Sequence, residues 1–309
     1  MRPSLRVCVC VSGFLLLLPA LRLLGQAAPP AAKLEPVRAI VEDFGQDDAD
    51  APWLGWTLFG PVEADLGECD LIVCQEPDPD NPDGLPLVFG QFDYDCGPED
   101  APHWMGARLD MPLPGKPVAV ELLVCGDASG NRLAFSMGDS TGEWLNYSTA
   151  PVTWEGWKTV KVYLRTPAAH GGGDEDGKLD LPASLNSINI EPAGKVRQGT
   201  LLFEDIAVLT EIGPEDALYP RVYLREEDDK TIVQVLTTNL ASTPQRADVL
   251  CEVLGPNNFP WAETRFQPDL QPGETSTDEI ELPANQHVQT VSATITYPGG
   301  LTKTIEKRF

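Results

Sequence analysis

The sequence predicts an all-β protein, and three observations lead to this fold class. Its 309 residues include 29 Pro and 27 Gly, and both residue types interrupt helix interiors. Apolar and polar residues alternate in segments such as 157–164 and 290–297, which is the pattern of strands with one buried and one exposed face. Hydrophobic residues make up 42% of the chain and include seven Trp, so we expect a packed core rather than disorder.

Short predicted strands separated by turns of Gly, Pro, Asp and Asn follow one another along the chain, a spacing typical of β-sandwiches. Further strands are expected at 38–44, 71–74, 87–94, 104–111, 118–125, 132–137, 144–148, 187–190 and 201–209. A break at 213–219 is interpreted as a linker. Residues 37–212 have the length of a jelly-roll β-sandwich, and residues 220–309 that of a smaller immunoglobulin-like β-sandwich. In the second region, 270–275 is expected to be a tight turn before a strand.

The first residues have the features of a secretory signal peptide. Arg2 and Arg6 precede an apolar run over 7–21, and Gly25 and Ala27 fit a cleavage site. We therefore expect residues 1–27 to be removed and residues 28–36 to form a flexible leader, with a product that is secreted or periplasmic/extracellular. A retained membrane anchor is the weaker alternative, because the run is shorter than the roughly 20 residues that span a bilayer. No membrane span is expected after cleavage.

Cysteine usage agrees with export in part. Cys69, Cys74 and Cys96 share one loop-rich region, and an oxidising compartment favours one disulfide among them, whose pairing the sequence leaves open. Cys125 and Cys251 lie in strand-like segments. Five cysteines remain after signal cleavage, and this odd count leaves at least one free thiol, which is expected to be buried.

The charge balance excludes one class of partner. The chain has 47 Asp and Glu against 22 Lys and Arg, a formal net charge of −25. Binding to nucleic acid or to an anionic membrane needs clustered basic residues, so neither partner is expected. The three His, at positions 103, 170 and 287, lie in unrelated contexts and form no known catalytic motif. A carboxylate pair can hydrolyse a glycosidic bond, but among so many acids the sequence singles out no such pair.

Several segments together resemble one family of domains. These are AIVEDF at 39–44, LLVCGDASGNRL at 122–133, WEGW at 154–157, GGDEDGKLDLP at 172–182 and GTLLFEDI at 199–206. In this order they resemble galactose-binding-like domains, the jelly-roll fold of many carbohydrate-binding modules. Residues 220–309 are similar to immunoglobulin-like modules appended to bacterial secreted glycosidases. The resemblance implies a β-sandwich that binds a glycan, and the chain departs from it in a Cys-containing, Pro-rich insertion at 68–100.

The resemblance also implies a structural Ca²⁺ that links the first and last strands of the sandwich. Glu42 and Asp43 match the opening motif, and Glu204 and Asp205 match the closing one. Ca²⁺ binds six to eight oxygen ligands, so carboxylates of this kind suit it. Two acidic loops are alternatives. Segment 174–180 has part of a calcium-loop pattern but fails the EF-hand spacing, which leaves a looser site open. Segment 78–84 is more simply a series of turns.

Aromatic residues are the candidates for glycan binding, because sugar rings stack on Trp and Tyr while their hydroxyls need polar partners. The ligand-binding residues that we predict are Trp104, Trp56, Tyr94, Trp144, His103 and Arg108. Trp104, which directly follows His103 in the region of the insertion, is the strongest of them. Trp154 and Trp157 are instead expected to close the core.

Together these observations predict a secreted, non-catalytic carbohydrate-binding protein with a structural calcium ion. Two alternatives stay open. One is a structural or assembly module that binds another protein, for instance through the immunoglobulin-like region. The other is a glycoside hydrolase whose carboxylate pair the sequence does not reveal.

Overall fold

The computed structural model describes residues 35–45, 53, 55–60, 69–76, 87–97, 104–193, 195–227, 229–284 and 286–309. The predicted signal peptide, most of the leader, His103 and segment 78–84 lie outside these residues. The all-β prediction is confirmed: the helices in the described ranges are two 3₁₀ turns, Pro214–Asp216 and Pro256–Asn258. No helix of the described residues is long and apolar enough to cross a membrane.

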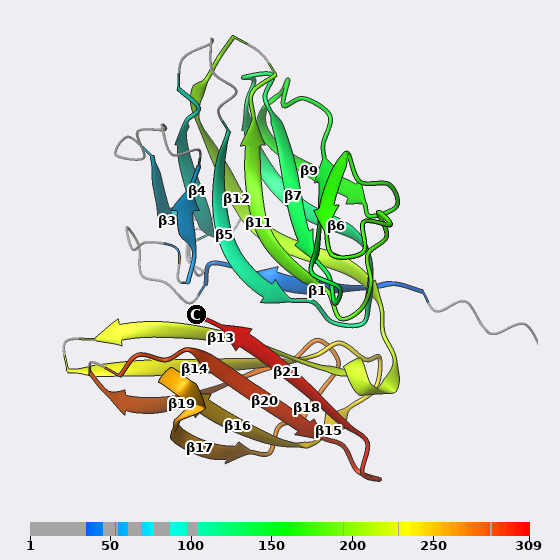
Figure 1. Ribbon diagram of the computed structural model, residues 1–309, viewed down its shortest axis with the longest axis vertical. Coiled ribbons are helices and arrows are strands. Elements are labelled where there is room, and N and C mark those ends of the chain that lie inside the picture. The colour runs from blue at the N-terminus through cyan, green and yellow to red at the C-terminus, as the bar shows by residue number, and fades with distance from the viewer. Residues whose placement is uncertain are drawn as a thin grey trace, which may run out of the picture. The chain divides into compact units, whose positions relative to one another are not determined.

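Strands β1 to β12 form two six-stranded antiparallel sheets (Figure 1). The first sheet, here called sheet A, has the order β3-β4-β12-β6-β9, with β1 also paired to β12. Its strands are β1 (Val37–Glu42), β3 (Asp70–Glu76), β4 (Leu87–Asp95), β6 (Lys116–Asp127), β9 (Glu155–Tyr163) and β12 (Gln198–Glu211). The second, sheet B, has the order β10-β8-β7-β11-β5-β2. Its strands are β2 (Thr57–Phe59), β5 (Met105–Pro112), β7 (Arg132–Gly138), β8 (Glu143–Ser148), β10 (Ala169–Gly172) and β11 (Ser184–Glu191).

The connections between these strands give the jelly-roll topology that the sequence predicts. Sheet A contains the run β4-β12-β6-β9, and sheet B contains the run β5-β11-β7-β8. The chain therefore passes repeatedly from one sheet to the other, and neighbouring strands in a sheet are mostly distant in sequence. This double Greek-key arrangement is that of a jelly-roll sandwich.

The inner faces of the two sheets share one hydrophobic core. Alternate residues of the strands enter it, as the period-2 pattern predicts. In β8, for example, Leu145 and Tyr147 are buried in the core, whereas Trp144 and Asn146, which alternate with them, face outward. The outward face of sheet B is therefore free to carry a different set of side chains.

The region after the linker forms smaller sheets of its own. Strands β13 (Leu218–Glu227), β14 (Lys230–Asn239) and β19 (Thr275–Pro283) form a three-stranded sheet. A four-stranded sheet has the order β17 (Pro260–Phe266), β16 (Asp248–Leu254), β20 (Thr290–Thr296) and β21 (Thr302–Arg308). Short strands β15 (Gln245–Arg246) and β18 (Asp269–Leu270) pair with each other. The predicted tight turn is confirmed at Gly273, whose φ is +77°. The immunoglobulin-like assignment of this region stays a prediction, as does its division from the first sandwich as a separate domain.

Residues 34–309 form one compact unit, and hydrogen bonds join the two sets of sheets. Tyr219 on β13 donates its hydroxyl hydrogen to the Pro112 carbonyl, 2.9 Å away, and Tyr223 donates to the Val41 carbonyl at 3.3 Å. The Arg221 guanidinium donates to the Asp43 carboxylate at 3.1 Å. Two of these contacts lie at the end of β1, where Glu42 lies.

The prediction of at least one free, buried thiol is confirmed. Cys251 is buried in the second region, and burial raises the pKa of its thiol to about 12. Cys125 is half-buried in β6. Cys96 is a free, buried thiol whose pKa burial also raises to about 12, so the predicted disulfide does not involve it.

Candidate functional site

The outward face of sheet B carries a groove of about 310 Å³. It is lined by Phe59, Trp104, Ser136, Trp144, Asn146, Ser187, Asn189 and Glu191. This combination of aromatic rings with neutral polar side chains is typical of sites for small polar organic ligands. A larger cavity of about 840 Å³ has no aromatic residue among its lining side chains.

The strand register explains why the polar residues of the groove lie together. Ser136 on β7 pairs with Asn146 on β8 and with Ser187 on β11. Paired residues of antiparallel strands point to the same face, so these three side chains form one row across the sheet. Asn189, two residues after Ser187, starts the adjacent row. The result is a polar floor on a rigid sheet.

Trp144 stands on the β10 side of this floor. Its side chain is 43% exposed, which is unusual for an indole in a protein with a large core. A Cβ atom on Gly171 of β10 would lie 3.0 Å from Trp144 Cζ2, so the glycine lets the indole rest directly on the neighbouring backbone. Trp144 is thus a ring supported on one side and open to ligand on the other.

Trp104 and Phe59 form the aromatic part of the groove on the β2–β5 side. Their ring centroids are 5.0 Å apart at an interplanar angle of 74°, an edge-to-face contact. Phe59 pairs in register with Gly106 of β5. A Cβ on Gly106 would approach the Phe59 ring to 2.5 Å and Asn189 Oδ1 to 2.3 Å, so only glycine leaves room for both.

The hydrogen bonds within the groove leave one acceptor open. Ser187 donates to Asn189 Oδ1 at 3.2 Å, and Ser148 donates to Glu191 Oε2 at 3.0 Å. Asn146 Oδ1 is buried and has no hydrogen-bond partner among the described residues. A buried acceptor without a donor is costly, and a ligand hydroxyl in the groove would supply that donor.

The structure brings together some of the residues that the sequence predicts for ligand binding and separates others. Trp104 and Trp144 both line the groove. Arg108 is exposed and pairs in register with Ser187 and Thr57, so it borders the groove, where its guanidinium contacts the Asp110 carboxylate at 2.6 Å. His103 lies outside the described residues.

The prediction is corrected for Trp56 and Tyr94, because both side chains are buried. Trp56 is 7% exposed, and its indole nitrogen donates to Glu42 Oε2 at 3.0 Å. Tyr94 is 2% exposed and donates to Asp127 Oδ2 at 2.6 Å, and burial raises the pKa of its hydroxyl. Both rings belong to the core and offer no face to a ligand on the surface. Trp157, predicted to close the core, is instead exposed on β9 of sheet A.

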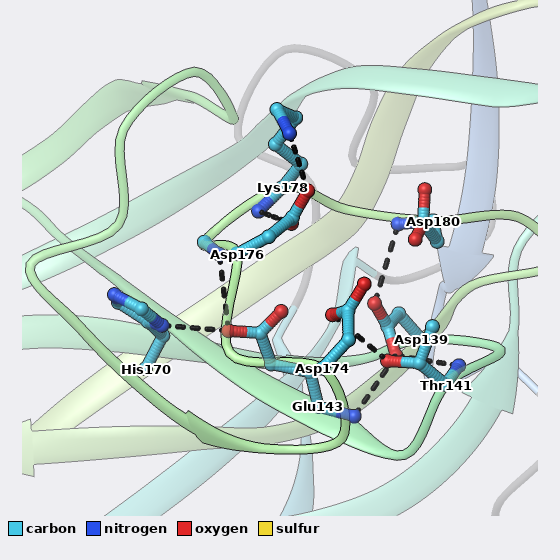
Figure 2. A network of polar contacts seen from close by, with 9 residues as sticks. Asp139, Thr141, Glu143, His170, Asp174, Asp176, Lys178 and Asp180 are labelled. Carbon is cyan, nitrogen blue, oxygen red and sulfur yellow. Dashed lines mark hydrogen bonds and ion pairs between the residues drawn. The ribbon is translucent and has the colours of Figure 1, made fainter.

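The four carboxylates predicted to bind calcium have other partners. Glu42 accepts hydrogen bonds from the Phe44 amide at 2.9 Å and from Trp56. Asp43 contacts Arg221, and Asp205 contacts Arg38 at 2.9 Å. Glu204 lies next to Asp205, and burial raises its pKa. Calcium between these four acids stays a prediction that their contacts do not support. Instead, the described residues bring a different set of acids together, shown in Figure 2.

Sequence reasoning missed most of the groove floor. The signal that would have found it is the polar half of the strand pattern. Asn146 and Ser148 alternate with buried residues, and so do Ser187, Asn189 and Glu191. The apolar residues of the strands predict the core, but the polar residues between them, which face outward, were assigned no role.

Comparisons with known proteins give distant similarities. No protein-family model matches the chain, and no curated protein matches it. A family 11 carbohydrate-binding module of a cellulosomal cellulase from Clostridium thermocellum is similar at 15% identity and a TM-score of 0.35, over 57% of this chain and 96% of that one. An arabinose-bound α-L-arabinofuranosidase is similar at 18% identity and a TM-score of 0.37, over 57% of this chain but 26% of that one. A glycosyl hydrolase family 2 member from Bacteroides cellulosilyticus reaches a TM-score of 0.29 at 12% identity, over 67% of this chain and 28% of that one. At these scores the matches assign no ligand to this chain.

Proposed function

We propose that the protein is an exported, non-catalytic glycan-binding protein whose ligand occupies the groove on sheet B. The observation that carries the proposal is the combination of the exposed Trp144 ring, the Trp104 ring and a polar floor in one groove. Sugar rings have apolar C–H faces that stack on indoles and hydroxyls that need hydrogen-bond partners, and the groove offers both. The open acceptor of Asn146 is the partner that a sugar hydroxyl would meet.

The acid content of the groove favours binding over hydrolysis. Hydrolysis of a glycosidic bond uses two carboxyl groups on opposite sides of the bond. Among the residues that line the groove, Glu191 is the one acid, and its carboxylate accepts the Ser148 hydroxyl. The groove as described thus holds a ligand in place without supplying an acid and a base.

Binding of the purified protein to a panel of soluble polysaccharides tests this proposal. The panel consists of mixed-linkage β-glucan, xylan, arabinan and galactan, with affinity gel electrophoresis as the first readout and calorimetry for any that bind. Loss of one stacking ring removes about 1.5 kcal/mol, so Trp144→Ala and Trp104→Ala should each weaken binding by about tenfold. Trp157→Ala is the matched control, because Trp157 is 46% exposed but lies on sheet A. Binding to none of the polysaccharides, or equal losses in all three variants, would refute the groove as the binding site.

A further inference from the structure

Three carboxylates from two separate segments meet at the edge of sheet B. Glu143 is the first residue of β8, and Asp174 and Asp176 lie in the segment between β10 and β11. One oxygen atom of each lies within 4.8 Å of the others. Figure 2 shows the three side chains close together, with His170 in contact with Glu143 and Lys178 in contact with Asp176.

The Glu143 side chain is the observation that separates this cluster from ordinary surface acids. It is fully buried, with 0% of its side chain exposed. Its Oε1 atom contacts His170 Nδ1 at 2.6 Å and accepts the Gly177 amide at 3.2 Å. Its Oε2 atom is buried without a hydrogen-bond partner in the part of the chain that the structure describes. A buried carboxylate oxygen without a donor is costly, and two further carboxylates beside it raise that cost.

We propose that Glu143, Asp174 and Asp176 bind a divalent cation, and that this cation is Ca²⁺. Ca²⁺ takes six to eight oxygen ligands at about 2.3–2.6 Å, so two ligand oxygens on opposite sides of the ion lie about 5 Å apart. The three oxygens lie within 4.8 Å of one another, which leaves them close enough to share one such ion. Mg²⁺ demands near-ideal octahedral geometry and usually keeps several waters in place of protein ligands, and Zn²⁺ favours nitrogen and sulfur ligands. Loop carbonyls and water complete the coordination.

Other contacts hold the two segments in place around the site. Asp139, before β8, accepts the amides of Thr141 and Glu143 at 2.9 Å each and that of Asp180 at 3.4 Å. Burial opposes its ionisation, but these hydrogen bonds hold the pKa of Asp139 below its usual value. Asp139 thereby joins the β7–β8 turn to the segment after β10. Hydrogen bonds to ligand carboxylates, such as that of His170 to Glu143, orient them in metal sites.

Calcium titration by calorimetry tests the site. The purified protein is first freed of metal with EGTA and then titrated with CaCl₂, and with MgCl₂ for comparison. We expect one Ca²⁺ per chain, bound more tightly than Mg²⁺. Glu143→Gln and Asp174→Asn should each weaken Ca²⁺ binding at least about tenfold, because each removes one ligand charge. Glu175→Gln is the matched control. Glu175 is an exposed acid of the same segment that lies outside the cluster, so this variant should bind Ca²⁺ as the wild type does.

A second measurement separates loss of the site from loss of the fold. Ca²⁺ should raise the thermal unfolding midpoint of the wild type and of Glu175→Gln but not that of Glu143→Gln, because a ligand stabilises only the state that binds it. In EGTA, Glu143→Gln should unfold at the wild-type temperature or above it. Should that variant not fold, Asp174→Asn, altered at an exposed position, decides the question. No Ca²⁺ binding by the wild type, or wild-type binding in both ligand variants, would overturn the proposal.

Discussion

Glu42 and Glu143 are two buried glutamates of the same sandwich, and their surroundings differ. Glu42 ends β1 and is 3% exposed, whereas Glu143 begins β8 and is 1% exposed. The sequence singles out Glu42 only through the family resemblance, since each of the two lies next to a turn in an acid-rich chain. Their neighbours determine what each carboxylate does.

Glu42 is surrounded by hydrogen-bond donors and by positive charge. Its Oε1 accepts the amides of Asp43 and Phe44, and its Oε2 accepts the Trp56 indole N–H. The buried side chains of Arg221 and Lys307 interact with it electrostatically. Both oxygens of Glu42 therefore have partners that the protein itself provides.

Glu143 has donors on one oxygen only, and other carboxylates lie close to it. Its Oε2 has no hydrogen bond in the described ranges, and one carboxylate oxygen of Glu143 lies within 4.8 Å of an oxygen of Asp174 and of Asp176. The comparison indicates that burial of an acid does not by itself identify a metal site. The informative feature is a buried carboxylate with one oxygen that has no donor and with further carboxylates close to it, because such a group favours a cation from outside the chain.

The largest difference between the two glutamates should appear in the free energy of unfolding when each is replaced by alanine. Glu42→Ala removes the partner of two buried donors and leaves Arg221 and Lys307 with less compensating charge, so it should lower the free energy of unfolding by about 3 kcal/mol. Glu143→Ala, in EGTA, also removes repulsion between carboxylates and should change it by less than about 1 kcal/mol. Urea denaturation of both variants and the wild type measures this. Equal losses would show that both glutamates are structural and would weaken the assignment of a cation to Glu143.

A smaller effect should appear in the pH dependence of stability. Burial, together with the neighbouring Asp43 carboxylate, raises the pKa of Glu42 from 4.5 to about 7. Between these values the folded protein binds more protons than the unfolded chain, so this group's contribution to stability falls as pH rises. From pH 5 to pH 7.5 the fall amounts to about 2 kcal/mol. Lys307, whose pKa burial lowers to about 8, contributes in the opposite direction and mainly above this range.

Glu42→Gln isolates that contribution from the other acids of the chain. The variant keeps the size of the side chain but cannot ionise, so its stability relative to the wild type should increase between pH 5 and pH 7.5. Denaturation curves at several pH values in this range give the difference directly. Parallel pH profiles for variant and wild type would show that Glu42 does not titrate there.

The jelly roll was predictable because its signals are local. Alternation in segments such as 157–164 depends only on which face of a strand is buried, and the structure places β9 at Glu155–Tyr163. The short strand β10 (Ala169–Gly172) was not predicted, because a Gly-rich edge strand has little apolar pattern. That strand carries Gly171 and leads into the acidic segment, so its absence from the prediction also hid the site beside it.

The candidate sites were less predictable because they depend on register. Trp56 and Trp144 are both Trp residues near strand ends, yet one is buried and the other exposed. Nothing in a single sequence specifies that Ser136, Asn146 and Ser187 form one row, since this follows from pairings between distant strands. Likewise, Glu143 meets Asp174 and Asp176 only because β10 pairs with β8. Sequence reasoning left the loop of the two aspartates open as a site but could not supply the third ligand.

The smallest expected effect links the two proposed sites, which lie on the same strand pair. Trp144 follows Glu143 in β8, and its indole rests on Gly171, shortly before Asp174. A cation that fixes the segment after β10 therefore also fixes the backbone beneath the Trp144 ring. Glycan affinity of the wild type should be about threefold higher in CaCl₂ than in EGTA, a coupling of ~0.6 kcal/mol, whereas Glu143→Gln should show no calcium effect.

Thermodynamic linkage provides the check on this coupling. If calcium strengthens glycan binding threefold, then saturating glycan must strengthen calcium binding by the same factor. Calorimetric titration of CaCl₂ with and without the best polysaccharide measures this. Trp144→Ala should retain calcium binding but lose the coupling, because the ring that connects the two sites is gone. Calcium affinity that does not change with glycan would mean that the two sites act independently, even if each proposal is correct by itself.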